Sequence, residues 1–116
     1  MRDIKNYEGL YAVTSCGRVW SYKSNQFLTN SLNHTGPYGY SCVYLYKDSK
    51  RKKHFIHRLV AEAYIDNPSG LPEVNHIDEN KSHNYLSNLE FCTKKYNNNY
   101  GTRNQRIAEY QLERVR

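Results

Sequence analysis

The chain has 116 residues, a formal net charge of +6, 38% hydrophobic residues and 12 tyrosines. This length predicts one domain, or two small lobes that share a core. The aromatic content, 14%, argues against a disordered chain. A mixture of Tyr with Lys and Arg is typical of surfaces that meet phosphates and bases.

Several classes of protein are excluded by what the sequence lacks. It has no run of 18 apolar residues and no apolar stretch at its N-terminus, so we expect no membrane span, no signal peptide and a cytoplasmic location. The three cysteines, Cys16, Cys42 and Cys92, are widely spaced and form no Cys-x-x-Cys pair. We therefore expect reduced thiols, no disulfide framework and no zinc site.

The first half of the chain predicts antiparallel strands. Residues 10–14 and 18–22 are rich in β-branched and aromatic residues and flank a turn at Gly17, as in a hairpin. Residues 30–38 predict a loop, and residues 40–46 alternate as a strand does. A charged tip at 47–52 then predicts a turn before a partner strand at 53–56.

In the second half of the chain, the spacing of the apolar residues changes from that of a strand to that of a helix. Apolar residues recur with helical spacing over 56–64, and residues 67–70 end that helix. Two short extended pieces, 73–76 and 89–92, flank a polar segment. Thr93 predicts the N-cap of a helix that begins at Lys94 and stops at Gly101. Residues 102–116 predict a basic helix or tail.

Three motifs carry a resemblance to a known family. They are VNHIDENK at 74–81, the residues Asn84 and Asn97 around NLEFCT at 88–93, and the helical HRLVA at 57–61. Together they resemble an HNH endonuclease of the phage and intron-encoded homing type. Tyr7 to Tyr11, Val13 and GRV at 17–19 resemble the modular DNA-binding segment often fused to such nucleases.

The resemblance implies an α+β fold in which N-terminal antiparallel hairpins precede a helix and a ββα-metal finger. It divides the chain into an N-terminal β-rich DNA-binding segment at 1–55, a nuclease motif at 56–101 and the C-terminal segment at 102–116. It also implies hydrolysis of phosphodiester bonds in double-stranded DNA.

Site residues follow from the resemblance position by position. His76 falls on the general base, and a neutral imidazole accepts a proton readily near neutral pH. Asn75 and Asn97 fall on the metal ligands, for one Mg²⁺ or Mn²⁺ ion per site. Asn88 falls on a structural position. From the residues themselves, we expect His57 to pack against or support the site and Asp78 to anchor a loop turn. Since both ligands are neutral, we expect a metal site that depends on bound DNA, with Asp78, Glu79 or Glu90 as sources of negative charge.

Basic residues indicate where DNA would bind. The cations at the predicted hairpin tip suit a β-hairpin that meets the DNA backbone and releases counterions. The candidates for DNA contact are Arg18, Lys23, Lys50, Arg51, Lys52, Lys53 and Lys81.

Two other readings stay open from the sequence. The first is an HNH-like module that binds DNA but is catalytically weak or inactive because its metal ligands are neutral. The second is a structural domain that acts within a larger assembly. No heptad pattern predicts a dimer, so we expect a monomer with one active site.

Overall fold

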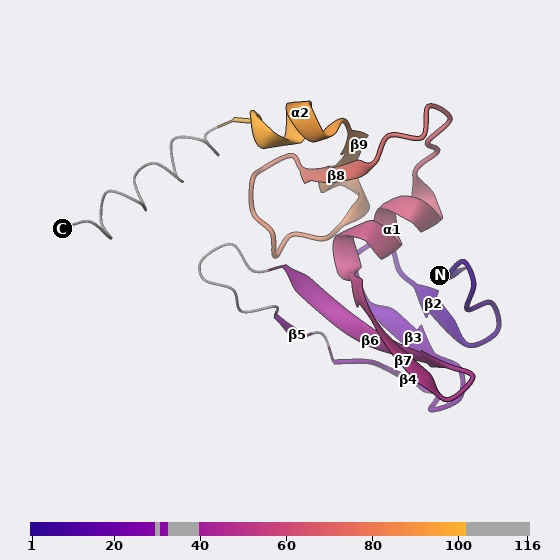
Figure 1. The fold of residues 1–116 in the computed structure, drawn as a ribbon. Helices are drawn as coiled ribbons and strands as arrows, with labels where there is room; N and C mark the ends of the chain where they lie inside the picture. The colour runs from indigo at the N-terminus through magenta and orange to yellow at the C-terminus, as the bar shows by residue number, and fades with distance from the viewer. Residues whose placement is uncertain (30, 33–39, 102–116) are drawn as a thin grey trace.

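The computed structural model describes residues 1–29, 31–32 and 40–101. It confirms the α+β class: three antiparallel sheets are combined with two α-helices, and the predicted hairpins precede the longer helix (Figure 1). The predicted basic segment at 102–116 lies outside the described residues, as does most of the predicted loop at 30–38.

The N-terminal sheet has four short strands in the order β1-β2-β3-β4. They span Arg2–Asp3, Tyr11–Val13, Val19–Ser21 and Gln26–Phe27. The predicted hairpin is confirmed, because β2 pairs antiparallel with β3. At its turn, Gly17 has a φ of 84°, a left-handed conformation that glycine adopts without steric cost.

The second sheet contains β5 (Ser31–Leu32), β6 (Ser41–Lys47) and β7 (Lys50–Phe55). Two expectations are corrected here. Part of the predicted loop is the short strand β5, which pairs with β6. The basic residues from Lys50 onward are also not a hairpin tip, because they already belong to β7.

The turn between β6 and β7 explains that correction. Asp48 and Ser49 have φ values of 53° and 64°, and Lys47 faces Lys50 across the ladder. Two consecutive residues with positive φ make the tight connection whose twist matches that of the flanking strands. The turn therefore needs only two residues, and the cations extend the ladder.

The helix α1 spans Ile56–Tyr64 and begins directly after β7. Its apolar stripe is confirmed, with Ile56, Leu59 and Val60 buried. The helix ends at Tyr64, earlier than the predicted stop at 67–70. In that segment the Asn67 side chain bonds both the amide and the carbonyl of Leu71, at 2.9 Å each, and so closes a separate turn.

The remaining described residues form a unit that we call the finger, residues 73–101. It contains β8 (Glu73–His76), the 3₁₀ turn Leu86–Asn88, β9 (Leu89–Cys92) and α2 (Lys94–Asn98). Thr93 is the N-cap as predicted, since its hydroxyl accepts from the Tyr96 amide at 3.1 Å. The helix ends at Asn98 rather than at Gly101. The strand pair contacts α1 and α2, which lie on either side of β8 in Figure 1.

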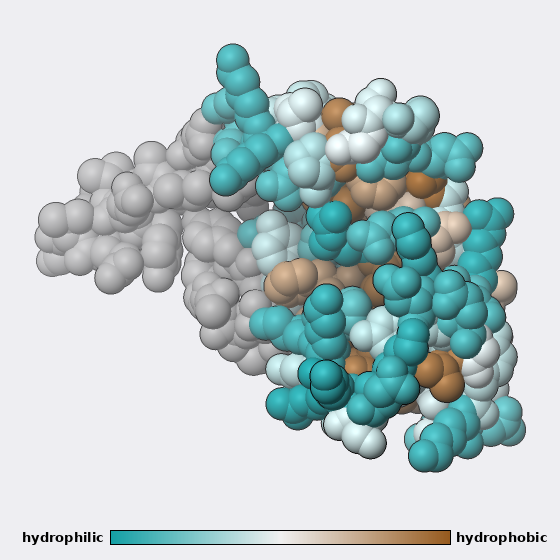
Figure 2. All heavy atoms as spheres, turned by 45° about the vertical axis from the view of Figure 1, so that its right-hand side comes forward, coloured by the Kyte–Doolittle hydropathy of each residue, from teal (hydrophilic) through white to brown (hydrophobic). Residues whose placement is uncertain are grey.

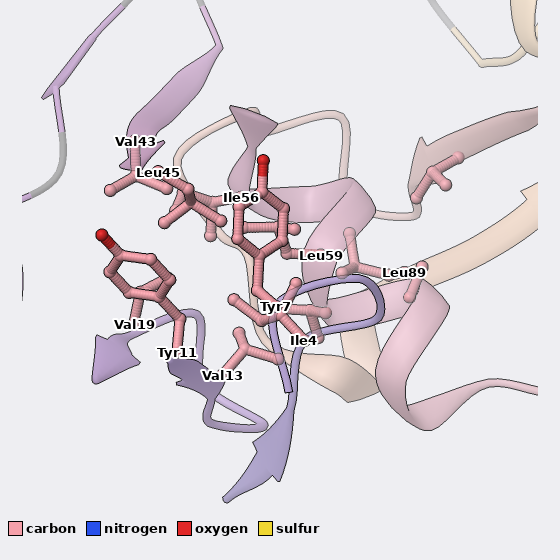
Figure 3. Close-up of a cluster of buried hydrophobic side chains, with 13 residues drawn as sticks. Ile4, Tyr7, Tyr11, Val13, Val19, Val43, Leu45, Ile56, Leu59 and Leu89 are labelled. Atoms are coloured by element: carbon pink, nitrogen blue, oxygen red, sulfur yellow. The ribbon is translucent and has the colours of Figure 1, made fainter. Parts of the chain in front are cut away.

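One hydrophobic cluster joins these parts. It takes Tyr7 and Val13 from the N-terminal segment, Leu45 from β6, Val60 from α1 and Leu89 from β9 (Figure 3). Because these side chains are shielded from water by one another, the N-terminal sheet and the finger are held against the same helix.

The surface is largely polar. Figure 2 shows hydrophilic side chains over most of one face, with hydrophobic atoms in scattered patches. Among the described helices, none is long and apolar enough to cross a membrane. The three cysteines are free thiols, with Cys16 exposed and Cys42 and Cys92 buried.

Candidate active site

His76 is the last residue of β8 and its side chain is 5% exposed. Its Nε2 lies 2.7 Å from Oδ1 of Asn84. An amide oxygen only accepts, so Nε2 carries the proton in the neutral ring and Nδ1 keeps its lone pair. Burial, the largest influence, lowers the pKa of His76 below its ordinary value of 6.5. The imidazole is therefore a neutral base at pH 7.

Asn84 is itself held by the N-terminal hairpin. A Cβ at Gly17 would lie 2.8 Å from the Asn84 carbonyl oxygen, so the hairpin turn approaches this residue as closely as only glycine allows. Two residues further on, the Leu86 amide donates to the Ser15 carbonyl at 2.7 Å. The turn of the first hairpin thus fixes the segment that positions His76.

On its other side, His76 is packed against the rings of His57 and Tyr40. Its centroid lies 5.0 Å from that of His57 and 6.0 Å from that of Tyr40, and Tyr40 stacks on His57 at 4.8 Å. Burial, followed by repulsion from His76 when it is protonated and from Arg58 and Lys81, lowers the pKa of His57 to about 3. His57 is therefore a neutral packing partner of the candidate base at any pH at which the protein would work.

A hydrogen-bonded loop follows His76. The amides of Asp78 and Asn80 donate to the side-chain oxygens of Asn88 and Asp78, at 3.0 and 2.8 Å. The buried Asn88 side chain also donates to Asp78 Oδ1 and to the His83 carbonyl, at 2.9 Å each. Hydrogen bonds, led by the one from His83 at 2.6 Å, lower the pKa of Asp78 to about 2. Asn88 and Asp78 thus tie the loop to the start of β9.

Asn75 faces away from this loop. Neighbouring strand residues point to opposite faces, so His76 lies toward α1 and Asn75 toward the side of α2. Asn75 is 5% exposed, and its Nδ2 donates to Glu90 Oε1 at 2.9 Å. Asn97 is half-buried on α2, the helix that packs against β8.

Asn75 and Asn97 are the candidate ligands for a divalent ion that is shared with a substrate. Among the described residues, no group of three or more His, Cys, Asp and Glu could hold a metal ion. The Oδ1 of Asn75 is turned away from Glu90, because the amide nitrogen makes that contact. Magnesium is bound in proteins by oxygen ligands together with substrate phosphates. Asn75 and Asn97 would supply two amide oxygens and no carboxylate, so such an ion would depend on the substrate phosphate for its negative charge.

The strand alternation divides the basic cluster of β7 between two faces. Arg51 and Lys53 share a face with Tyr46 and Tyr44, their partners across the ladder. The Arg51 guanidinium lies 4.4 Å from the Tyr44 ring centre. Lys50 and Lys52 lie on the opposite face, toward the N-terminal segment, where Tyr7 Oη is 2.9 Å from His54 Nε2.

The other basic candidates are spread over the molecule. Arg18 is exposed with its guanidinium 3.9 Å from the Phe27 ring centre. Lys23 is exposed and lines a hollow of about 640 Å³ with Tyr46 and Lys47. Lys81 lies over the Tyr40 ring, with Nζ 4.3 Å from the ring centre. Of these three, Lys81 is the one beside His76.

Sequence reasoning assigned no role to two residues that shape this site. Asn84 stands in the motif that carries the resemblance, but its contact with His76 spans eight residues of polar loop. Tyr40 directly precedes β6, and no local pattern links it to His57. Both contacts depend on how separate segments pack.

The comparisons with known proteins concern the family of the chain as a whole, and no family model matches it. An uncharacterized HNH endonuclease of Acanthamoeba polyphaga mimivirus is 45% identical over 75% of this chain and 26% of its own length. The DNA endonuclease I-HmuI of Bacillus phage SP01 is 38% identical over 83% of this chain and 53% of its own. The endonuclease F-TflII of Escherichia phage T5 is 39% identical over 73% and 44%.

The chain thus spans about a quarter to a half of the length of these curated relatives. A solved structure, of DNA binding and cleavage by the HNH homing endonuclease I-HmuI, matches with a TM-score of 0.75 and 34% identity. That match covers 96% of this chain and 67% of the other. The chain belongs to the HNH homing endonuclease family.

Proposed function

We propose that this chain is a metal-dependent endonuclease that hydrolyses phosphodiester bonds of duplex DNA, by nicking or cutting it. The observation that carries the proposal is the geometry of His76. It is a buried, neutral imidazole whose Nε2 is held by Asn84, so that Nδ1 is its basic atom. The family membership and the DNA cleavage described for I-HmuI point the same way.

In the proposed step, water attacks the phosphorus and gives its proton to His76 Nδ1. The bond from phosphorus to the leaving 3′ oxygen breaks, and that oxygen takes up a proton from solvent. In an in-line displacement the attacking and leaving oxygens lie on opposite sides of the phosphorus. We assign His76 to the side of the attacking water, and the ion held by Asn75 and Asn97 to the side of the leaving oxygen.

Asn75 and Asn97 would hold one divalent ion, Mg²⁺ or Mn²⁺, through their side-chain oxygens. When bound, the ion supplies positive charge at the phosphate and at the leaving oxygen. Asn88 and Asp78 keep the intervening loop folded, and His57 and Tyr40 exclude water from one side of His76.

For DNA binding we favour the face of the β6–β7 hairpin that carries Arg51 and Lys53. Ring contacts lead from this face toward His76: Phe55 lies 5.7 Å from Tyr40, which adjoins His57 and His76. Cations on a surface continuous with the base can bind the backbone on either side of the cleaved bond. Lys81, beside Tyr40, would contact the nearest phosphates, and Arg18, Lys23, Lys50 and Lys52 would contact DNA further away.

The same proposal assigns a role to each segment of the chain. Residues 1–55 bind DNA, residues 56–101 carry the chemistry, and the segment at 102–116 adds positive charge. We propose that the protein acts as a monomer in the cytoplasm of a bacterial or phage-infected host cell, where its phage relatives would meet DNA.

The test is the conversion of supercoiled plasmid in the presence of EDTA, Mg²⁺ or Mn²⁺, with wild-type protein and with His76→Ala. We expect open-circle or linear product with a metal ion only, and a rate lower by about 10²- to 10⁴-fold in the variant, the usual contribution of a general base. A metal-dependent rate that His76→Ala leaves unchanged would overturn the assignment of the base.

A second candidate is a DNA-binding module with little or no catalysis. The observation that favours it is that Asn75 and Asn97 are both uncharged, so the protein itself attracts a cation weakly. Its signature would be salt-dependent binding of duplex DNA without cleavage under any metal ion.

A further inference from the structure

Glu90 makes a contact that the proposed mechanism leaves unexplained. It lies on β9 directly across the ladder from Asn75, and its Oε1 accepts the Asn75 Nδ2 hydrogen bond at 2.9 Å. We propose that Glu90 is a positioning residue, which holds the Asn75 amide with its oxygen directed toward the metal ion. The inference rests on the proposed function, because it assumes that Asn75 is a ligand.

The physical argument begins with the asymmetry of an amide. An Asn side chain can rotate by half a turn and exchange its oxygen with its NH₂ group, at little cost in shape. Only the oxygen can bind a cation. An ionised carboxylate has no proton to donate, so it attracts the NH₂ group and repels the oxygen. Glu90 therefore selects one of the two orientations, and it is the orientation that a ligand requires.

Glu90 is also placed to supply the negative charge that the two Asn ligands lack. A charge-assisted hydrogen bond polarises the Asn75 amide and makes its oxygen a better electron donor. The Glu90 carboxylate is also hydrogen-bonded to Tyr96 on the adjacent helix α2. This bond, after burial, raises the pKa of Tyr96. Glu90 thus links the strand that carries Asn75 with the helix that carries Asn97.

The test compares Glu90→Gln with Glu73→Gln. A Gln side chain can both donate and accept, so Asn75 is satisfied in either orientation and the selection is lost. Glu73 is the matched control, because it is half-buried on the same face of β8, two residues from Asn75, and its replacement removes the same charge. Both changes are made in a His76→Ala parent so that DNA stays intact.

The measurement is NMR of the ¹⁵N-labelled protein bound to a short duplex, with Mn²⁺ added in steps. Paramagnetic Mn²⁺ broadens the signals of nearby nuclei, so it reports occupancy at Asn75 and Asn97 without any cleavage. We expect Glu90→Gln to need about tenfold more Mn²⁺ than the parent, as is usual when a partner of a metal ligand is lost. Glu73→Gln should stay within about twofold of the parent.

A rescue variant separates positioning from a general loss of structure. In Asn75→Asp with Glu90→Gln, the ligand has two equivalent oxygens and needs no selection, so Mn²⁺ broadening should return to the concentration seen in the parent. Equal Mn²⁺ requirements for the parent and Glu90→Gln would overturn the role of Glu90. No selective broadening near Asn75 in the parent would instead overturn the metal site, and with it that part of the proposed function.

Discussion

In the finger, three polar side chains of the loop after His76 are held by other polar groups, whereas on one face of the β6–β7 hairpin two cations lie over aromatic rings. Asn84, Asn88 and Asp78 each make a hydrogen bond to a fixed partner. Arg51 and Lys53 instead lie against Tyr44 and Phe55, at 4.4 and 5.3 Å from the ring centres. Catalysis needs groups fixed within a fraction of an ångström, while DNA contacts tolerate adjustment. Single substitutions in the finger should therefore cause large losses of stability or rate, and substitutions on the hairpin should cause small losses of DNA affinity.

The largest effect on folding is expected at Asn88. Asn88→Ala removes three hydrogen bonds from a side chain that is 5% exposed. At roughly 1 kcal/mol for each bond, the free energy of unfolding should fall by about 3 kcal/mol. Urea unfolding followed by the fluorescence of Trp20 measures this change. Lys94→Ala, at an exposed position of α2, is the control and should stay within about 0.5 kcal/mol. An Asn88→Ala loss as small as that of the control would show that the loop is not held by this residue.

A second effect concerns pH and His57. Its pKa is about 3 in the folded chain against an ordinary value of 6.5, so between those values the unfolded chain binds a proton that the folded chain does not. The free energy of unfolding must therefore fall as the pH falls through this window, by about 2 kcal/mol between pH 7 and pH 5.

The variant His57→Phe isolates this contribution. It keeps a ring against Tyr40 but cannot take up a proton, so its stability should change less over the same pH range, by about 2 kcal/mol. Urea unfolding at pH 7 and pH 5 gives both differences. Identical pH dependence in the two proteins would mean that His57 titrates normally when folded.

A smaller effect is expected from Asn84. Asn84→Leu has a similar size but offers no acceptor to His76 Nε2, so the ring loses its preferred tautomer and orientation. We expect single-turnover nicking to slow by about tenfold while DNA affinity is unchanged. Asn84→Asp retains an acceptor oxygen and should keep most of the rate. A Leu variant as fast as wild type would show that His76 does not need this bond.

The smallest effect for each side chain is expected on the hairpin. Replacing Arg51 and Lys53 together by Gln should weaken DNA binding severalfold. The slope of the logarithm of the binding constant against the logarithm of the salt concentration should become shallower by about 0.9 for each phosphate that is no longer neutralised. Lys50 and Lys52 provide a matched pair on the opposite face of the same strand. Fluorescence anisotropy over a salt series compares the two double variants. A larger effect from Lys50 and Lys52 would reverse the proposed orientation of the hairpin.

Local patterns were enough to predict most of the helices and strands. Residues that are close in sequence determine the apolar spacing of α1, the cap at Thr93 and the strands around residues 74 and 90. The start of β7 was mispredicted because a run of six polar and charged residues suggests a loop. The left-handed conformations of Asp48 and Ser49, which shorten that loop, carry no strong sequence signal.

The site was predictable only in part. The resemblance pointed to His76, Asn75 and Asn97, and the structure brings β8 and α2 together. It did not reveal which groups orient them. The contacts of His76 with Asn84, of His57 with Tyr40 and of Asn75 with Glu90 each join separate segments. Such pairs follow from packing and register, which a single sequence specifies only through the whole fold.

The close approach of Gly17 to Asn84 has a consequence for exchanging parts between proteins. The border between residues 55 and 56 looks like a natural joint, since β7 ends there and α1 begins. Yet the first hairpin supports the loop that orients His76, through Gly17 and the Ser15 carbonyl. A chimera that joins this finger to a foreign N-terminal segment would contain His76 and Asn84 but lack the hairpin turn that holds Asn84 in place. A successful transplant would carry the hairpin turn along with the finger.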